Sequence, residues 1–285
     1  MKGGMLTPGT IGCLETGRSP THACAEKEAP VTRTIAVANQ KGGVAKTTTV
    51  ASVGMALAEL GQRVLVVDLD PQACLTFSLG LDPEALELSI HDVFMGRVGA
   101  AMAVRSITKN LDVLPSTIDL TGTEIALHDR PAREYELRTA LADVSSGYDF
   151  VLIDCSPSLG VLTINALTAA GEVLIPLQCE TLAHRGVGQL LDTVGDVRRL
   201  TNSDLVVLGV LPTLFDGRTT HARAVLADVS DRFGVTVLDP PINRSIRFAE
   251  APASGESILT TASSNPGAQA YRAHALQLMG EEAAA

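Results

Sequence analysis

The chain has 285 residues, 46% of them hydrophobic, so it is long enough and apolar enough to bury a full core. No apolar run approaches the roughly 18 residues of a membrane-spanning helix, and we expect no membrane span. The formal net charge of −10 argues against broad, nonspecific attraction to nucleic acid. The five cysteines lack the spacing of a zinc site or a disulfide framework, which is typical of a protein in a reducing cytoplasm.

The first 30 residues contain Gly, Pro, Thr and scattered charges but no apolar stretch of the kind that a secretory signal has. We therefore expect residues 1–30 to be a disordered N-terminal extension. An alternative is that the native protein starts near Val31. In either case residues 31–285 are predicted to form a single domain.

Short apolar strands alternate with helical segments along the rest of the chain. A strand over residues 33–39 leads through a Gly-rich turn into a helix over residues 47–60, which Gly61 is suited to end. The apolar run over residues 63–68 is typical of a parallel strand covered on both faces. Further strands are predicted at 111–114, 150–154, 172–177, 205–211 and 236–238, and helices at 132–144, 161–170, 182–200, 219–233 and 267–279. This alternation predicts an α/β fold with a doubly wound, mostly parallel sheet flanked by helices.

The Gly-rich turn is the most informative stretch of the sequence. From residue 39 it reads Asn-Gln-Lys-Gly-Gly-Val-Ala-Lys-Thr-Thr. A turn of this kind between a strand and a helix wraps backbone N–H groups around the phosphates of a nucleotide. The usual phosphate-loop pattern has glycines where this chain has Gln40 and Ala45, and Lys41 adds a second lysine before the glycine pair. The sequence therefore predicts a nucleotide site built by a variant phosphate loop.

Three aspartates follow predicted strands. Asp68 and Asp154 end their strands, and Asp70 comes two residues after the first of them. One such aspartate often only caps the next turn. Because ligands bind at the carboxyl ends of strands in open α/β sheets, we expect all three to meet the phosphate loop, which strengthens the prediction of a nucleotide site.

These motifs resemble those of the ParA/MinD family of deviant phosphate-loop ATPases, and within it the Soj/ParA partition proteins. The resemblance extends over residues 33–280, with several motifs in the family's order. Besides the phosphate loop it includes 67–72 (VDLDPQ), 151–160 (VLIDCSPSLG), 176–180 (PLQCE), 213–219 (TLFDGRT) and 246–252 (IRFAEAP). It implies the deviant phosphate-loop NTPase form of the expected fold, a Mg²⁺-dependent ATPase with ATP and Mg²⁺ as cofactors, and a cytoplasmic, nucleoid-associated protein.

The resemblance also implies roles for individual residues. Lys46 would hold the β- and γ-phosphates, Lys41 would reach the nucleotide of a partner subunit, and Asp70 would orient the attacking water. Magnesium would be bound by the hydroxyl of Thr47, with Asp68 and Asp154 near the ion and acting through water. The ATP-binding positions are Lys41, Gly42, Gly43, Val44, Ala45, Lys46, Thr47, Thr48 at the α-phosphate, and Thr213 and Asn243 beside the adenine.

Three positions depart from the family's pattern. Ala45 stands where most relatives have glycine; if its φ is positive, alanine costs on the order of 1 kcal/mol, and we expect a working but slower loop. Ser156 and Asn243 each replace a proline. The first change is expected to loosen the segment after Asp154, and the second to alter the contact with adenine.

Partners follow from the resemblance as well. Family members form ATP-dependent homodimers, bind DNA nonspecifically, and respond to a ParB-like partner that stimulates hydrolysis. The DNA-binding arginines match Arg218 and Arg247, and such binding depends on local rather than net charge. The alternative is that these arginines only form solvated ion pairs with Asp216 and Glu250.

The predicted function is therefore ATP hydrolysis by a homodimer that acts in chromosome or plasmid partition, or in cargo positioning. An alternative is a MinD-like membrane- or protein-positioning ATPase without DNA binding. Membrane attachment of that type needs a basic amphipathic C-terminal helix, whereas this chain ends in acidic and small residues, so no membrane partner is expected. A role in electron transfer would need cluster-ligating cysteines, and Cys155 and Cys179 are expected to be core residues instead. A metabolic kinase would need an acceptor-site motif, and we find no convincing one.

Overall fold

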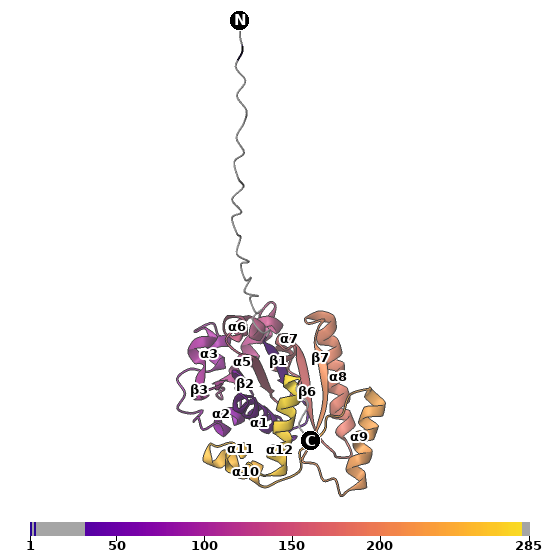
Figure 1. Ribbon diagram of the computed structural model, residues 1–285. Coiled ribbons are helices and arrows are strands. Elements are labelled where there is room, and N and C mark those ends of the chain that lie inside the picture. Colours follow the sequence, from indigo (N-terminus) through magenta and orange to yellow (C-terminus); the bar gives the residue numbers. More distant parts are fainter. Residues whose placement is uncertain (2, 4–31, 281–285) are drawn as a thin grey trace. The chain divides into compact units, whose positions relative to one another are not determined.

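The computed structural model describes residues 1, 3 and 32–280, except for the side chains of residues 253 and 254. The N-terminal extension expected over residues 1–30 therefore lies almost wholly outside the described residues, and its disorder stays a prediction. Residues 32–280 belong to one compact unit. Figure 1 shows this unit as a sheet with helices packed around it.

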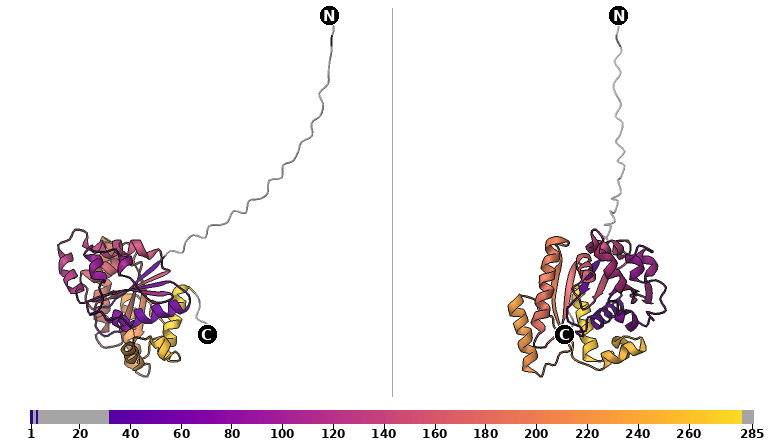
Figure 2. Two further views of the ribbon diagram at one scale, coloured as in Figure 1. Left: turned by 90° about the vertical axis from the view of Figure 1, so that its left-hand side faces the viewer. Right: turned by 180° about the vertical axis from the view of Figure 1, so that it is seen from behind.

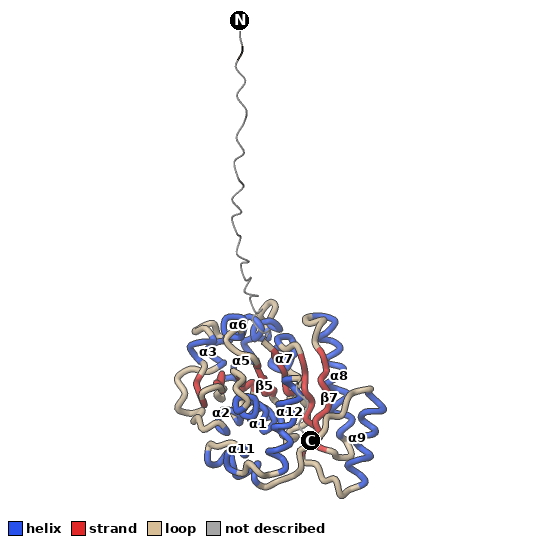
Figure 3. Tube along the Cα trace, viewed as in Figure 1, coloured by secondary structure: helices blue, strands red, loops and turns tan. Residues whose placement is uncertain are grey.

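The sheet has seven strands in the order β3-β4-β2-β5-β1-β6-β7. Its strands are β1 (Arg33–Val37), β2 (Val64–Leu69), β3 (Arg105–Thr108), β4 (Leu111–Leu114), β5 (Phe150–Cys155), β6 (Glu172–Gln178) and β7 (Val206–Thr213). All neighbours in this sheet pair in parallel except β3, which pairs antiparallel with β4 at the edge. Figure 3 shows these strands between helices, so the predicted doubly wound, mostly parallel sheet is confirmed.

The central strands are buried on both faces. Every residue of β2 and β5 is buried, as their nearly continuous apolar runs require. Because side chains alternate along a strand, Leu65 and Val67 of β2 join one apolar cluster, whereas Val64 and Val66 join another. The core is therefore divided into two layers by the sheet.

Each layer is closed by its own group of helices, and Figure 2 shows helices on both sides of the strands. One layer contains buried residues of α1 (Lys46–Glu59), α2 (Cys74–Ser78), α11 (Ile258–Thr261) and α12 (Pro266–Met279). The other contains buried residues of α3 (Ile90–Phe94), α4 (Ala100–Ala103), α5 (Leu120–His128), α6 (Glu136–Ser145), α7 (Val161–Ala169), α8 (Ala183–Leu200) and α9 (Thr220–Phe233). The short α10 (Arg247–Glu250) and two 3₁₀ turns, Arg133–Tyr135 and Ala251–Ser254, complete the fold. No helix in the described part of the chain is both long and apolar enough to cross a membrane.

Several short elements were not predicted from the sequence. The helices α2, α3, α4, α10 and α11 have four or five residues each, too few for an apolar period to be recognised. Their formation depends on packing and on caps such as the Ser89 side chain, which accepts from the His91 N–H at the start of α3. Conversely, the strand predicted over residues 236–238 is wrong: Val237 forms only an isolated bridge with Val210.

Candidate nucleotide site

The phosphate loop connects the end of β1 to the start of α1. Ala45 immediately precedes the helix with φ 64° and ψ 34°, in the left-handed region. Gly43 also has a positive φ, of 72°. The left-handed conformation costs an alanine about 1 kcal/mol relative to glycine. Ala45 therefore has the positive φ at which alanine was expected to be less stable than glycine.

Side chains from neighbouring strands fix the loop in place. The buried Asn39 amide donates to the Pro176 carbonyl of β6 at 2.7 Å, and its Oδ1 accepts from the Lys41 N–H at 3.0 Å. The Thr213 hydroxyl at the end of β7 donates to the Val44 carbonyl at 2.9 Å. Asn39 opens the motif, but no separate role was predicted for it. These bonds hold the loop between β1, β6 and β7, while Gly42 and Gly43 are exposed at its tip.

Lys46 lies at the centre of the loop. Its side chain is buried, and its Nζ donates to the Lys41 carbonyl at 3.2 Å. Burial lowers the pKa of Lys46, and the nearby Asp154 carboxylate opposes that change. The ammonium is thus enclosed between the loop backbone and the carboxyl end of β5, which is the environment that binds an anion.

The aspartates of β2 and β5 lie side by side, since Asp68 and Asp154 are partners in the parallel register. Asp68 is fully buried and accepts from the Thr76 N–H at 2.8 Å, from the Thr76 hydroxyl at 2.7 Å and from the Asp70 N–H at 3.2 Å. Burial raises the pKa of Asp68 to about 6, against the effect of these bonds. Both carboxylate oxygens of Asp68 therefore already accept hydrogen bonds from the protein.

Asp154 differs from Asp68 because neither of its carboxylate oxygens has a hydrogen-bond partner among the described residues. Burial and then the neighbouring Asp68 raise the pKa of Asp154. The Thr47 hydroxyl, which lies close to this carboxylate but does not meet hydrogen-bond geometry with it, and the Lys46 ammonium lower that pKa in part. A buried carboxylate without a partner is costly unless a ligand supplies one. Mg²⁺ takes oxygen ligands, keeps several waters, and is commonly held by one or two carboxylates. The Asp154 oxygens and the Thr47 hydroxyl therefore fit a hydrated magnesium ion.

Asp70 lies at the open side of this cluster. It is half-buried, and its Oδ1 accepts from the Gln72 N–H at 2.9 Å. The charge of Asp70 acts on the pKa of both Lys46 and Asp154, which places it near them. The structure thus brings the three aspartates to the phosphate loop, as their positions after the strands suggest.

Lys41 points away from this cluster. Its ammonium forms an ion pair with Glu180, just beyond β6 of the same subunit, and lies 3.5 Å from Gln178 Oε1. Glu180 belongs to the PLQCE segment but carries no signal of its own, and it was not predicted as a site residue.

A cavity of about 660 Å³ is lined in part by Glu180. Its walls include Phe215, Asn243 and Arg244. The Phe215 N–H donates to Ile242 at 2.9 Å, and the Arg244 N–H donates to Phe215 at 3.2 Å, so two distant segments are joined there. Asn243, expected beside the adenine, thus lines this cavity, whereas the buried Thr213 is not among its lining residues. Phe215 and Arg244 were not identified from the sequence.

The two arginines expected at DNA are exposed but paired. Arg218 binds Asp216 at 2.8 Å, and Arg247 binds Glu250 at 2.8 Å, with 91% and 60% of the arginine side chains exposed. These are the ion pairs of the alternative interpretation. Each arginine's charge is therefore offset by a carboxylate of its own chain.

Several known proteins are similar to this chain. A family model described as an AAA domain matches residues 32–207. The chain is 44% identical over 238 residues to the sporulation initiation inhibitor protein Soj of Bacillus subtilis, covering 83% of this chain and 94% of Soj. It is 42% identical over 253 residues to the chromosome partitioning protein ParA of Caulobacter vibrioides, covering 88% and 95%.

A solved structure from Mycobacterium smegmatis is also similar. It is named cobyrinic acid a,c-diamide synthase, was determined with bound ADP and magnesium, and is 55% identical with a TM-score of 0.79, covering 87% of this chain and 94% of that one. A second structure of it holds an ATP analog and magnesium. The chain thus belongs to the ParA/MinD family of deviant phosphate-loop ATPases, among the relatives of Soj and ParA.

Proposed function

We propose that this protein hydrolyses ATP in the site formed by the phosphate loop and the carboxyl ends of β2 and β5. The observation that carries the proposal is the pair of buried, unpartnered Asp154 oxygens beside Thr47 and Lys46. A hydrated cation between a nucleotide and this carboxylate would satisfy both oxygens. The ADP and ATP analog in the similar M. smegmatis structures, each with magnesium, support the same ligands here.

Each residue of the site has a distinct task in this reaction. When bound, Mg²⁺ would offset part of the charge on the phosphates. Lys46 binds the β- and γ-phosphates through its enclosed ammonium, and Asp70 accepts a hydrogen bond from the attacking water and so orients it. Thr47 would supply its hydroxyl to the metal, and Asp154 and Asp68 would act on it through water. Little covalent chemistry is required of the protein, because positioning and charge lower the barrier.

The remaining contacts place the nucleotide. Backbone N–H groups from Gly42 to Thr48 surround the phosphates, with Thr48 at the α-phosphate. The cavity lined by Asn243 and Phe215 receives the adenine, and the Thr213 hydroxyl holds the loop through Val44.

We further propose that ATP closes a homodimer in which Lys41 acts on the partner's nucleotide. A lysine in the phosphate loop whose ammonium turns away from its own phosphate site is available for such a contact once it leaves Glu180. The protein would then bind DNA through Arg218 and Arg247 in the cytoplasm, at the nucleoid, and release it when a ParB-like partner stimulates hydrolysis. Similarity to Soj and to ParA supports a role in partition.

Amide synthesis is a second candidate because of the name of the M. smegmatis relative. Release of ammonia from an amide donor would need an activated nucleophile such as a thiolate. Within the described residues, burial raises the pKa of Cys74, of Cys155 and, to about 11, of Cys179, so none of these thiols is activated. This favours ATP hydrolysis. The MinD-like alternative differs from partition in lacking DNA binding, which an ATP-dependent DNA-binding assay decides.

The proposed function is tested by phosphate release from Mg-ATP, with and without glutamine. We expect the wild type to release phosphate without glutamine, and Lys46→Ala to lose both ATP binding and release. Phosphate release that requires glutamine and a carboxylate acceptor would instead support amide synthesis.

A further inference from the structure

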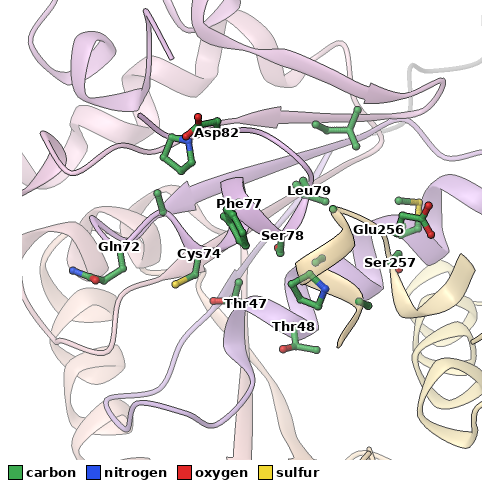
Figure 4. Close-up of a pocket in the computed structure, with 18 of the residues that line it drawn as sticks. Thr47, Thr48, Gln72, Cys74, Phe77, Ser78, Leu79, Asp82, Glu256 and Ser257 are labelled. Atoms are coloured by element: carbon green, nitrogen blue, oxygen red, sulfur yellow. The ribbon is translucent and has the colours of Figure 1, made fainter. Parts of the chain in front are cut away.

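Residues 68–76 carry Asp70 from the end of β2 into α2 through a tight turn. The Asp70 carbonyl accepts from the Ala73 N–H at 2.9 Å. Ala73 is buried and has φ 50°, in the left-handed region, a conformation that an alanine keeps only where the surrounding structure holds it. Figure 4 shows Cys74 of this turn near Thr47 of α1, and both line the same cavity. Whatever fixes this turn therefore also fixes Asp70 beside the nucleotide site.

A single carboxylate holds both ends of this turn. Asp68 Oδ1 accepts from the Asp70 N–H at 3.2 Å, and Asp68 Oδ2 accepts from the Thr76 N–H at 2.8 Å. The Thr76 hydroxyl donates to the same Oδ2 at 2.7 Å. Asp68 and Thr76 are both fully buried, so water does not compete for these bonds. Asp68 therefore ties Asp70, near one end of the turn, to Thr76 at the other end.

The Thr76 hydroxyl also binds the segment that follows β4. Its Oγ1 accepts from the N–H of Ser116, another fully buried residue, at 2.9 Å. Because β4 is the neighbour of β2 in the sheet, the hydroxyl joins α2 to the ends of two adjacent strands. A hydroxyl group has one hydrogen to donate and can accept as well, and Thr76 uses both capacities here. A methyl group in its place would take one bond from Asp68 and leave the Ser116 N–H without this partner.

A buried threonine hydroxyl often serves only to satisfy a neighbouring polar group. Thr168 of α7 is such a case: it is 1% exposed, and its hydroxyl forms a hydrogen bond of 2.8 Å with the hydroxyl of Thr201, at the end of α8. Thr76 differs because its partner is the carboxylate that also binds the Asp70 N–H. A displacement of α2 at Thr76 therefore reaches Asp70 through one side chain.

We propose that Thr76 is a positioning residue for ATP hydrolysis, because its hydroxyl, acting through Asp68, holds Asp70 in the orientation that receives the attacking water. This inference rests on the proposed function, in which Asp70 orients that water. Thr76 acts on Asp68 and not on the nucleotide, which the phosphate loop binds. A shift of about 1 Å in a positioned group can slow a reaction roughly a hundredfold. The hydroxyl therefore contributes to the rate of hydrolysis and not to the affinity for ATP.

The test compares two variants of the full-length protein, Thr76→Val, which replaces the hydroxyl by a methyl group, and Thr76→Ser, which keeps the hydroxyl. We expect Thr76→Val to lower kcat for phosphate release by roughly tenfold to a hundredfold. Its dissociation constant for ATP and its Mg²⁺ requirement should stay within about twofold of the wild type. Thr76→Ser should restore kcat to within about threefold of the wild type. Thr76→Ala removes the same hydroxyl without placing a methyl group against Asp68, and it serves in place of Thr76→Val if that variant does not fold.

Hydrogen–deuterium exchange measures the turn itself and needs no hydrolysis. Without nucleotide, Thr76→Val should speed amide exchange over residues 69–76, and Thr76→Ser should leave it as in the wild type. The matched control is Thr168→Val, which removes a buried hydroxyl bond away from this turn. Thr76→Val and Thr168→Val should both melt about a few degrees below the wild type. Only Thr76→Val should change kcat or the exchange of residues 69–76.

Several results would overturn the positioning role. These are a Thr76→Val protein with the kcat or the exchange of the wild type, a Thr76→Ser protein as slow as Thr76→Val, and a Thr168→Val protein slowed as much as Thr76→Val. A raised Mg²⁺ requirement at unchanged kcat would also overturn it, because Thr76 would then act on the metal through Asp68. A wild type that releases no phosphate means failure of the proposed function, whereas an unaffected Thr76→Val variant of an active wild type means failure of this inference alone.

Discussion

The ammonium of Lys41 and the carboxylate of Glu180 form an ion pair within one subunit, across the gap between the phosphate loop and the end of β6. About 39% of the lysine side chain and 53% of the glutamate side chain are exposed. The pair holds the Lys41 ammonium beside Glu180, which lines the cavity of the same subunit where adenine is expected. A contact of Lys41 with a second subunit therefore requires that this pair first break.

Glu180→Gln should favour the ATP-bound dimer. Exposed ion pairs contribute about 0.2–1 kcal/mol and two such pairs break in each dimer, so we expect the dimer dissociation constant to fall by roughly 2- to 30-fold. Light scattering with Mg-ATP measures this change. Asp196→Asn, which breaks a comparable exposed pair with Arg199 on α8, is the control and should have no effect. A dimer weakened by Glu180→Gln as much as by Lys41→Ala would contradict this interpretation of the pair.

The raised pKa values of the buried aspartates determine how the free energy of unfolding depends on pH. The pKa of Asp68 is raised from 3.8 to about 6, and that of Asp154 is also raised. Both groups keep protons in the folded state that the unfolded chain has already released. Their contribution to the free energy of unfolding therefore falls as pH rises from about 4 toward about 6 and beyond.

Asp154→Asn removes one of these ionisations. We expect the nucleotide-free variant to have a higher melting temperature than the wild type at neutral pH and a flatter dependence on pH. Its ATP affinity should no longer respond to Mg²⁺. Melting curves across this pH range and titrations of Mg²⁺ at fixed ATP measure both effects. A variant that is less stable at neutral pH and still responds to Mg²⁺ would show that the Asp154 oxygens do not serve the metal.

Ala45→Gly should relieve the left-handed backbone at the start of α1. We expect the free energy of unfolding to rise by up to about 1 kcal/mol, less the cost of a more flexible unfolded chain. Nucleotide binding should be kept and hydrolysis should be faster. Ala132→Gly, at another alanine with positive φ but away from the loop, should affect stability alone. Loss of nucleotide binding in Ala45→Gly would mean that the alanine methyl is required by the site.

A DNA-binding assay shows whether Arg218 and Arg247 contact phosphates or only form ion pairs within their own chain. Asp216→Asn/Glu250→Gln frees Arg218 and Arg247 from their partners, so ATP-dependent binding to nonspecific duplex should strengthen. Charge reversal at both arginines should abolish this binding. The control Asp143→Asn/Asp192→Asn removes two exposed acids of α6 and α8, so it changes the net charge equally and should have a smaller effect. Binding that no arginine or acid variant alters would leave the two arginines as surface ion pairs only.

Much of the site could be predicted because its residues follow strands. The variant loop after β1, and Asp68 and Asp154 at the ends of β2 and β5, meet because parallel strands end at the same edge of the sheet. The Lys41–Glu180 pair and the Thr213–Val44 bond could not be predicted, because they depend on how β6 and β7 lie against the loop. The antiparallel strand β3 was missed because the Lys109-Asn110 turn before β4 lacks the Asn-Gly or Asp-Gly signal of a hairpin.

The central claim is that Lys41 completes the ATP site of a second subunit, and mixing two inactive variants tests it most directly. A Lys41→Ala subunit keeps its own Asp70, and an Asp70→Ala subunit that pairs with it can supply the missing Lys41. If the lysine acts across a two-fold dimer, neither variant alone should release phosphate, and an equimolar mixture should regain roughly a quarter of the wild-type rate, since half of the dimers are mixed and each has one complete site. A mixture as inactive as its components, or a Lys41→Ala protein that hydrolyses ATP at the wild-type rate by itself, would contradict the account.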